Sequence, residues 1–256
     1  MAFNKKSAQI IKARIKRIRI MKEFKARLIA RIKRTPSVES FRFVLAQKLE
    51  FIPGQFTQVI FDENNRENRE LNKYLSFSSS PDREYVEVTK RLTGSVFSVR
   101  LMGLKINNEV LLKAPSGNCI FKDEYKNIGF LIGGIGITPV ISIIEYIINL
   151  KLGTDIALVY SNRTDEEIAF KQELDYWKSL NNNLRIYYFV TDCQPKDKSC
   201  IYGAITKDLL KEKVCDLDKR ILFIFGPPKM VEAMKVLSFE LGCNKENIKS
   251  ESFIGY

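Results

Sequence analysis

The chain has 256 residues, of which 45% are hydrophobic and 28% charged, and it carries a formal net charge of +12. This length suits two domains of ordinary size, and the composition is typical of a soluble globular protein. The sequence contains no histidine, which excludes imidazole acid–base catalysis, histidine metal ligation and a histidine-ligated haem. Its five cysteines include no C-x2-C pair. This argues against a zinc site, an iron–sulfur cluster or a disulfide scaffold, and for a reduced cytoplasmic compartment.

Residues 1–20 form a basic N-terminal extension with seven lysines and arginines and no acidic residue. Such a segment can touch acidic lipid or nucleic acid, and Ile10, Ile11, Ile15 and Ile18 would share one face of a weakly amphipathic helix. Simpler interpretations are a solvated appendage or an extension upstream of the true start. No run of the sequence approaches the roughly 20 apolar residues of a membrane span, so membrane contact would be peripheral.

Residues 21–121 are predicted to form a small antiparallel barrel of six strands. Short stretches of alternating polar and apolar residues, separated by turns, are typical of strands at hairpin spacing. The expected strands are 23–34, 38–45, 51–61, 75–80, 85–89 and 109–113, with a brief helix at 95–101.

Residues 127–256, after a polar linker, show the alternation of strands and helices that predicts a Rossmann-like domain. The expected strands are 128–132, 156–160, 184–190, 221–225 and 249–253. The expected helices are 138–150, 165–180, 205–212 and 228–241. This order indicates a parallel sheet covered on both faces, with ligands at the carboxyl ends of its strands.

The segment 130–139 (FLIGGIGITP) joins an apolar strand to a helix through a tight turn. Gly133, Gly134 and Gly136 let the backbone bend and let a ligand come close, and Pro139 suits the first turn of a helix. The free N–H groups at that helix start favour an anion. A phosphate site and a buried turn without a ligand are both consistent with the segment alone, because short glycine motifs are common and the third glycine of the dinucleotide fingerprint is missing.

A tract of hydroxyl side chains occupies residues 76–80, after Lys73 and before Pro81. Hydroxyls on an extended strand, beside a cation and aromatic rings, can hydrogen-bond the polar edge of a flat heteroaromatic ring; the alternative is a polar turn ahead of the proline. Residues 94–98 (GSVFS) then open a short helix whose N-terminus could hold a pyrophosphate, with Lys90 and Arg91 just before it.

Taken together, these motifs resemble the ferredoxin–NADP reductase family of flavoproteins. In the first half, the matching segments are FIPGQF at 51–56 (the family's third strand), KYLS at 73–76 (its R-x-Y-S motif), GSVFS at 94–98 (its pyrophosphate-binding segment) and APSG at 114–117 (its G-P-x-G turn). In the second half, they are GGIGITP at 133–139, YSNR at 160–163, FKQEL at 170–174, FGPPKM at 225–230 and ESF at 251–253. The motifs stand in the family's order over nearly all of residues 21–256.

The resemblance implies an FAD-binding barrel at 21–121, an NAD(P)-binding domain at 127–256, and FAD and NAD(P)H as cofactors, without a metal. In the reaction, Ser76 would hydrogen-bond the reactive flavin nitrogen, Phe253 would cover the ring, Glu251 would orient the nicotinamide or relay a proton, and Phe225 would lie near the hydride path. The residues expected to bind the cofactors are Lys73, Tyr74, Leu75, Ser76, Phe77, Ser78, Lys90, Gly94, Ser95, Val96, Phe97, Ser98, Gly133, Gly134, Gly136, Ile137, Thr138, Pro139, Ser161, Arg163, Asp192, Gly226, Pro227 and Met230.

Several positions depart from the family's pattern. Lys73 replaces the arginine that grips pyrophosphate, keeping its charge and losing its bidentate fork. Leu75 stands where the family has a tyrosine against the flavin ring, so FMN is less excluded than usual. Tyr74 is expected on the opposite strand face. Phe225 stands where many members have a cysteine.

Asp192 argues for NADH over NADPH. It follows the third expected strand of the second domain, where a carboxylate would accept a hydrogen bond from the ribose 2′-hydroxyl and repel a 2′-phosphate. The alternatives are an exposed loop aspartate without a ligand, or a phosphate held by Arg163 or Lys196.

The expected function is hydride transfer from NAD(P)H to FAD, followed by electron transfer to a separate acceptor such as ferredoxin or flavodoxin, which the mildly basic body would attract if the acceptor is acidic. Alternatives are the reductase component of an oxygenase and an electron-transfer subunit of a larger dehydrogenase. From a different class, a flavin-free scaffold or a nucleic-acid binder using the basic residues 1–20 remains open.

Overall fold

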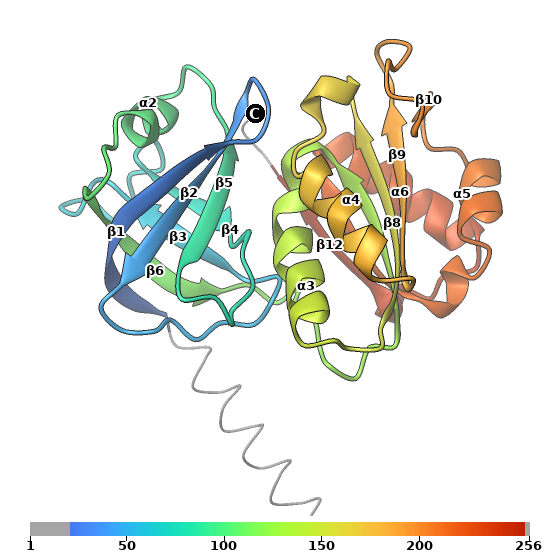
Figure 1. The fold of residues 1–256 in the computed structure, drawn as a ribbon, viewed down its shortest axis with the longest axis horizontal. Coiled ribbons are helices and arrows are strands. Elements are labelled where there is room, and N and C mark those ends of the chain that lie inside the picture. Colours follow the sequence, from blue (N-terminus) through green and yellow to red (C-terminus); the bar gives the residue numbers. More distant parts are fainter. Residues whose placement is uncertain (1–20, 254–256) are drawn as a thin grey trace, which may run out of the picture.

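The computed structural model describes residues 21–253, so the expectations for residues 1–20 lie outside the described part of the chain. The described residues form two six-stranded sheets, one antiparallel and rolled into a nearly closed barrel, the other parallel. Figure 1 shows the two units side by side, with α3 and β12 on the side of the parallel sheet that faces the barrel. The predicted fold class is therefore confirmed.

The barrel is built from the first six strands in the order β4-β3-β6-β1-β2-β5. Their bounds are Lys22–Lys33 (β1), Val38–Leu45 (β2), Phe56–Ile60 (β3), Asn72–Ser76 (β4), Val86–Arg91 (β5) and Glu109–Ser116 (β6), with helix α2 at Val96–Met102. A single bridge between Phe77 and Val88 brings the two edge strands together. Phe41, Phe43 and Phe97 are fully buried inside the barrel, which gives this unit its own core.

The third strand begins at Phe56 instead of residue 51 because a tight turn precedes it. Gly54 has a φ of +98°, and the amide of Gln55 donates back to the carbonyl of Ile52. A Cβ at Gly54 would also lie 2.3 Å from the carbonyl oxygen of Cys119, so the chain passes too closely for any side chain there. Pro53 and Gly54 thus mark a turn, and ladder pairing starts after them.

The parallel sheet has the order β10-β9-β8-β7-β11-β12. Its strands are Asn127–Gly133 (β7), Asp155–Asn162 (β8), Leu184–Val190 (β9), Cys200–Tyr202 (β10), Ile221–Gly226 (β11) and Ile248–Ser252 (β12). Its helices are Thr138–Asn149 (α3), Lys171–Leu180 (α4), Lys207–Lys213 (α5) and Pro228–Glu240 (α6). The core on one face contains residues of α3 and α4, and the core on the other contains residues of α5 and α6. Both faces are therefore covered, as expected for a parallel sheet.

Two elements of this unit differ from the sequence-based expectation. The expected helix 165–180 is a 3-10 turn at Asp165–Glu167 followed by α4, because Phe170 takes a left-handed backbone conformation with a φ of +61°. The short edge strand β10 was not predicted, since its three residues are too few for a recognisable alternation.

Salt bridges join the barrel to the parallel sheet. On α3, the buried carboxylate of Glu145 accepts a hydrogen bond from the Ser80 amide at 2.6 Å and pairs with Arg83. Arg34, at the end of β1, pairs with both Glu87 of the barrel and Glu173 of α4. The two units therefore have a charged, partly buried contact on the side of α3 and α4.

Candidate functional site

The order of the parallel strands places a crevice beside the glycine turn. The chain goes from β7 to β8 on one side, whereas β11 pairs with β7 on the other. Such a switch point is where open parallel sheets bind ligands, at the carboxyl ends of their strands. Gly133 ends β7 and Gly226 ends β11, and a Cβ at Gly226 would lie 3.1 Å from the amide nitrogen of Gly133. The two predicted glycine segments meet at this crevice.

The glycine turn packs directly onto the start of α6. A Cβ at Gly133 would lie 2.2 Å from the sulfur of Met230, and a Cβ at Gly136 would lie 2.6 Å from the carbonyl oxygen of Phe225. These two glycines are thus required for close packing. Gly134 differs, because its φ of +52° is left-handed and the space beside it is open except for the Arg91 guanidinium, whose Nη2 lies 3.9 Å from the Cβ position.

A cavity of about 520 Å³ lies between the barrel and the parallel sheet. Its barrel wall comes from β3, β4, β5 and the residue before α2, and its other wall comes from the glycine turn, the first residue of α3 and the end of β12. The lining residues are Phe56, Lys73, Tyr74, Leu75, Ser76, Thr89, Lys90, Arg91, Ser95, Ile135, Thr138, Glu251, Ser252 and Phe253. Nine of the predicted site residues are among these.

Three cations converge on this cavity from the barrel. Lys73 and Lys90 form no salt bridge within residues 21–253, and Arg91 has one carboxylate partner, Glu167. Burial lowers the pKa of Lys90, and the nearby Lys73 lowers it further. Positive groups held close together without counter-charges create a site for a polyanion. A dinucleotide with its pyrophosphate fits this donor set, and the aromatic side chains beside it suit flat rings.

The opposite wall of the cavity carries a buried acid. Burial raises the pKa of Glu251, which is the only carboxyl group that lines this cavity. The Cys119 thiol lies against it, and burial together with the Glu251 charge raises the pKa of Cys119 to about 12. The thiol is therefore protonated at neutral pH, unlike a reactive cysteine. Glu251 can accept or release a proton at the cavity surface.

Of the predicted hydroxyl tract, only Ser76 faces the cavity. It is 5% exposed, and its hydroxyl makes no hydrogen bond to another described residue. The next hydroxyls are used inside the barrel: Ser78 bonds Thr89 at 2.7 Å, and Ser79 accepts from the amide of Glu87 at 2.9 Å. Ser76 is thus the hydroxyl in the tract that is available to a ligand.

Several predicted residues lie elsewhere. Phe77 and Phe97 are fully buried in the barrel core, and Phe225 is fully buried in the core of the parallel sheet with its ring 6.3 Å from that of Phe253. These three side chains support the walls and do not line the cavity. The predicted site residues that do not line it are Phe77, Ser78, Gly94, Val96, Phe97, Ser98, Gly133, Gly134, Gly136, Ile137, Pro139, Ser161, Arg163, Asp192, Phe225, Gly226, Pro227 and Met230.

Tyr74 and Leu75 both line the cavity, although neighbouring residues of a strand point to opposite faces. Tyr74 is 59% exposed and stands edge-on to Phe56, with ring centroids 5.5 Å apart. At the edge of a strand, a long aromatic side chain can therefore reach the cavity rim from the outer face. An exposed tyrosine next to two lysines is a surface to which a flat ring can stack.

Sequence reasoning missed five lining residues: Phe56, Thr89, Arg91, Ile135 and Ser252. Arg91 had the clearest signal, since it adjoins Lys90, but its reach across to Gly134 depends on how the two units meet. Nothing in the local sequence specifies that arrangement.

Asp192 and Arg163 lie together at the end of the sheet. The nearest charged atoms of the pair are 4.0 Å apart, both side chains are mostly exposed, and the Asp192 amide donates to the carbonyl of Arg163 at 2.9 Å. Thr191 also donates to the Asp192 carboxylate, at 2.8 Å. This corner thus presents a carboxylate and a guanidinium to solvent.

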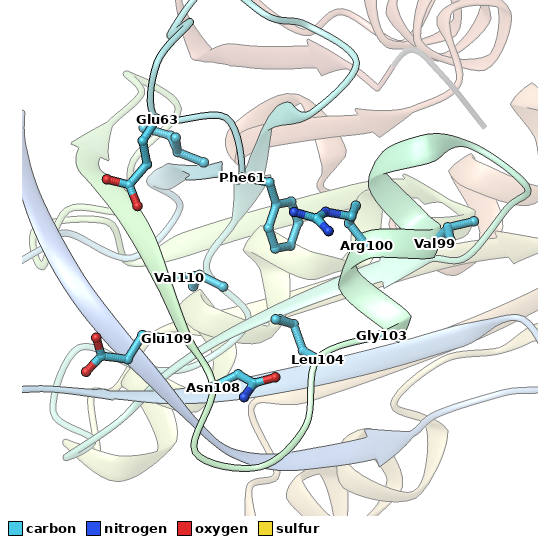
Figure 2. Close-up of a pocket in the computed structure, with 10 residues that line it drawn as sticks. Phe61, Glu63, Val99, Arg100, Gly103, Leu104, Asn108, Glu109 and Val110 are labelled. Atoms are coloured by element: carbon cyan, nitrogen blue, oxygen red, sulfur yellow. The ribbon is translucent and has the colours of Figure 1, made fainter.

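A second cavity, of about 570 Å³, lies on the barrel alone. Figure 2 shows Glu63 and Glu109 on one side of it and Arg100 of α2 on the other. Its charges are mixed and it contains none of the predicted site residues. Charge and chemistry therefore favour the slightly smaller cavity between the two units.

Within residues 21–253, no helix is both long and apolar enough to cross a membrane. The same residues contain no cluster of three or more cysteine, aspartate or glutamate side chains arranged to hold a metal ion.

The chain is similar in sequence to known oxidoreductases. Residues 130–235 match the profile of the oxidoreductase NAD-binding domain family. The chain is 30% identical over 210 residues to NADH-cytochrome b5 reductase 1 of Coccidioides immitis, a match that covers 78% of this chain and 64% of that protein. It is 27% identical over 233 residues to NADH-cytochrome b5 reductase 1 of Mortierella alpina, covering 89% and 78% respectively. The chain thus spans less than two thirds of the length of the Coccidioides protein.

Solved structures share the fold. The cytochrome b5 reductase domain of Ulva prolifera nitrate reductase aligns with a TM-score of 0.77 at 22% identity, covering 90% of this chain and 97% of that one. A ferredoxin NADP+ reductase from Neisseria gonorrhoeae, with bound FAD and NADP, aligns with a TM-score of 0.76 at 20% identity, covering 90% and 98%.

Proposed function

Because the chain belongs to the ferredoxin–NADP reductase-like family of oxidoreductases, we propose that it is an NAD(P)H-dependent flavin reductase whose site is the cavity between the barrel and the parallel sheet. The observation that carries this proposal is the set of three cations and three aromatic rings in one cavity that also faces the glycine turn. A flavin bound there supplies the chemistry, since it accepts a hydride from a reduced nicotinamide and passes electrons on one or two at a time.

The barrel residues would hold FAD. Lys73 and Lys90 would bind its pyrophosphate, Tyr74 and Leu75 would pack on its rings, and Ser76 would donate a hydrogen bond to a ring nitrogen. Lysines without counter-charges support this assignment, because a bound diphosphate would restore the ordinary pKa of Lys90.

The parallel sheet would hold the nicotinamide nucleotide. The 3-10 turn at Gly134–Ile137 lies at the switch point, and Ile135 of this turn and Thr138, the first residue of α3, line the cavity. Glu251 and Phe253 enter the cavity from β12, where Phe253 would cover one face of a ring and exclude water. Glu251 would hold or release a proton at the cavity surface.

NADH is the proposed electron donor, and a cytochrome b5-type haem protein is the proposed acceptor. Asp192 supports NADH, and the names of the related NADH-cytochrome b5 reductases support both choices. They favour a haem protein over the ferredoxin or flavodoxin expected from the sequence. Residues 21–256 carry the remaining charge of about +5, once the seven cations of residues 1–20 are subtracted from +12, which suits an acidic partner.

The test is anaerobic mixing of the purified, flavin-loaded protein with NADH and with NADPH, followed by addition of acceptors. We expect a yellow protein that is bleached faster by NADH and reoxidised rapidly by cytochrome b5, with slower reoxidation by ferredoxin and flavodoxin. A colourless protein that does not take up FAD would refute the proposed function, and equal bleaching by NADPH would refute the NADH assignment.

Ser76→Ala tests the position of the flavin. Loss of the one free hydroxyl of the tract should slow flavin reduction in stopped-flow measurements by about tenfold, because a hydrogen bond to the reacting ring is lost, while NAD+ affinity changes little. Ser78→Ala, which removes a hydroxyl that is already bonded to Thr89 and Glu87 inside the barrel, is the matched control. If the two variants reduce the flavin at the wild-type rate, Ser76 does not face the reacting nitrogen.

A further inference from the structure

Arg91, the last residue of β5, reaches from the barrel to the parallel sheet. Its Nη1 donates to Glu167 at 3.2 Å and to the Ser37 hydroxyl at 3.3 Å. Its Nη2 makes no hydrogen bond within residues 21–253 and lies 3.9 Å from where a Cβ of Gly134 would be. The guanidinium therefore stands over the glycine turn with one donor group occupied and one free.

The Arg91–Glu167 pair is weaker than the other salt bridges between the two units. Glu145 bonds both Arg83 and a backbone amide and is 8% exposed, and Arg34 binds two carboxylates while 7% exposed. Arg91 and Glu167 are 22% and 28% exposed and share one contact. A partly exposed pair of this kind contributes little to stability, so Arg91 can exchange its partner at small cost.

Unpaired polar groups lie beside this pair. The Tyr160 hydroxyl and the Asn162 amide lie close to each other, are more than nine-tenths buried, and make no hydrogen bond of standard geometry to a described residue. Burial raises the pKa of Tyr160, the neighbouring Asn162 side chain and Ala169 backbone lower it, and Arg91 and Glu167 lie close enough to add smaller effects in opposite directions. Buried polar atoms without partners are unusual in a native protein and are typical of a place where a ligand or water is bound.

We propose that Arg91 binds a phosphate of the nicotinamide nucleotide on the Gly133–Gly136 turn, and that Glu167 holds Arg91 until the nucleotide arrives. The inference rests on the proposed function. A phosphate on the turn would meet the free Nη2, and the guanidinium fork then gains two parallel charge-assisted hydrogen bonds in place of one contact with Glu167. Glu167 is thus a competitor for Arg91, and the nucleotide must displace it.

The experiment is a calorimetric titration of the oxidised, FAD-loaded protein with NAD+, which binds without reducing the flavin. Arg91→Ala should weaken NAD+ binding about tenfold, and Arg91→Lys should have an intermediate effect because it keeps the charge and loses the fork. Glu167→Gln should tighten binding by about twofold to fivefold, because the competitor loses its charge. The double variant should match Arg91→Ala.

Arg91→Ala and Glu167→Gln should change NAD+ affinity in opposite directions if Glu167 competes with the nucleotide for Arg91. If Arg91 and Glu167 only held the two units together, Glu167→Gln would weaken NAD+ binding as Arg91→Ala does, and that result would overturn the proposal. Arg100→Ala, which removes an exposed arginine on α2 that lines the second cavity instead, controls for the change in net charge. Its NAD+ affinity should equal that of the wild type.

A parallel titration of the apoprotein with FAD separates the two sources of phosphate. FAD affinity of Arg91→Ala should be unchanged; a variant that loses FAD but keeps its NAD+ affinity overturns the assignment to the nicotinamide nucleotide. A wild-type protein that retains FAD but does not bind NAD+ overturns the proposed function as well. If the wild type binds NAD+ and the Arg91 variants bind it equally tightly, the proposed role of Arg91 is overturned and the proposed function stands.

Discussion

Glu251 shows how one residue links the cavity to the pH dependence of folding. Its carboxyl group is partly withdrawn from water between β12 and the Cys119 thiol, and burial raises its pKa. The folded protein therefore holds this proton to a higher pH than the unfolded chain does. Between the ordinary pKa of a glutamate and the raised value, unfolding releases a proton, so stability falls as the pH rises through that window.

Glu251→Gln should remove this loss of stability. We expect the variant and the wild type to have similar melting temperatures near pH 4, where the wild-type carboxyl is protonated, and the variant to melt at a higher temperature near pH 7. Thermal unfolding followed by circular dichroism across this range measures the difference. Glu246→Gln, at an exposed position of the same segment, should show no such trend; if both variants behave alike, burial of Glu251 has no thermodynamic effect.

Asp192 permits a prediction about nucleotide choice. Asp192→Ser removes a carboxylate that would repel a 2′-phosphate and leaves Arg163 beside it without its partner. The ratio of kcat/KM for NADPH to that for NADH should rise about fivefold, because repulsion between exposed charges is on the order of 1 kcal/mol. Asp123→Ser, in the linker, carries the same charge change and should leave the ratio as it is. An unchanged ratio in Asp192→Ser would place the adenosine end elsewhere.

The glycine turn is the element on which the site depends. β7 ends at Gly133, a 3-10 turn follows, and α3 starts directly after it, while the turn presses against β11 and α6. Each glycine is needed for a different reason. Gly134 has a left-handed backbone, whereas a side chain at Gly133 would clash with the sulfur of Met230 and one at Gly136 with the carbonyl of Phe225. The turn is therefore held by packing before any ligand binds.

Alanine substitutions in this turn should differ in whether they can be relieved. Gly133→Ala meets the end of a flexible side chain and should lower the free energy of unfolding by about 1–3 kcal/mol. Gly136→Ala should lower the free energy of unfolding further, because its new methyl group would clash with the backbone of Phe225, which cannot move aside. In a Met230→Ala background the cost of Gly133→Ala should largely vanish, whereas that of Gly136→Ala should persist. Urea denaturation of the single and double variants measures this, and equal coupling to Met230 would contradict the observed packing.

At the level of elements, the periodicity of apolar residues in the sequence predicted most of the helices and strands. The strand at 184–190 and the helices at 138–150 and 228–241 match β9, α3 and α6 closely. The longer helix at 165–180 was wrong because the left-handed Phe170 is held by tertiary contacts, including the Arg34 guanidinium 4.3 Å from its ring centroid. Such a contact joins residues far apart in the chain, and no local pattern reports it.

The candidate site was predictable in its motifs and not in its geometry. Ser76, Lys73 and Glu251 stand in recognisable segments, and all three line the cavity. Arg91 was noted beside Lys90 but not assigned to the site, because its contacts with Gly134 and Glu167 arise where the two units meet. Residues that work across such a boundary carry no signature in either half of the sequence.

At the scale of the whole molecule, Arg34 is the main ionic connection between the units. It pairs with the buried Glu87 of the barrel and with Glu173 of α4, and it stacks on Phe170. Glu87 keeps a second partner, Arg42, at 2.7 Å. The contact therefore combines charge and aromatic packing at one point, next to α3 and α4.

Removing Arg34 should destabilise the docked arrangement. Arg34→Ala leaves Glu173 without its partner and Glu87 with one, and we expect the free energy of unfolding to fall by about 3 kcal/mol. Glu173→Gln, at the more exposed end, should cost at most about 1 kcal/mol. The single tryptophan, Trp177 of α4, reports unfolding of the parallel-sheet unit by fluorescence. Equal losses for the two variants would show that the aromatic contact and Glu87 contribute nothing.

The interleaving of the cavity walls also has a consequence for biosynthesis. The barrel is complete at the end of β6, Ser116, whereas the last lining residue is Phe253, so about 137 further residues must be added before the site exists. At roughly 5–20 residues per second, the complete barrel leaves the ribosome about 7–27 seconds ahead of the end of β12. During that interval the lysines and aromatic rings of the barrel face solvent without the wall that later shields them. The rate of translation therefore decides how long a flavin could bind to the barrel alone before the second wall of the cavity forms.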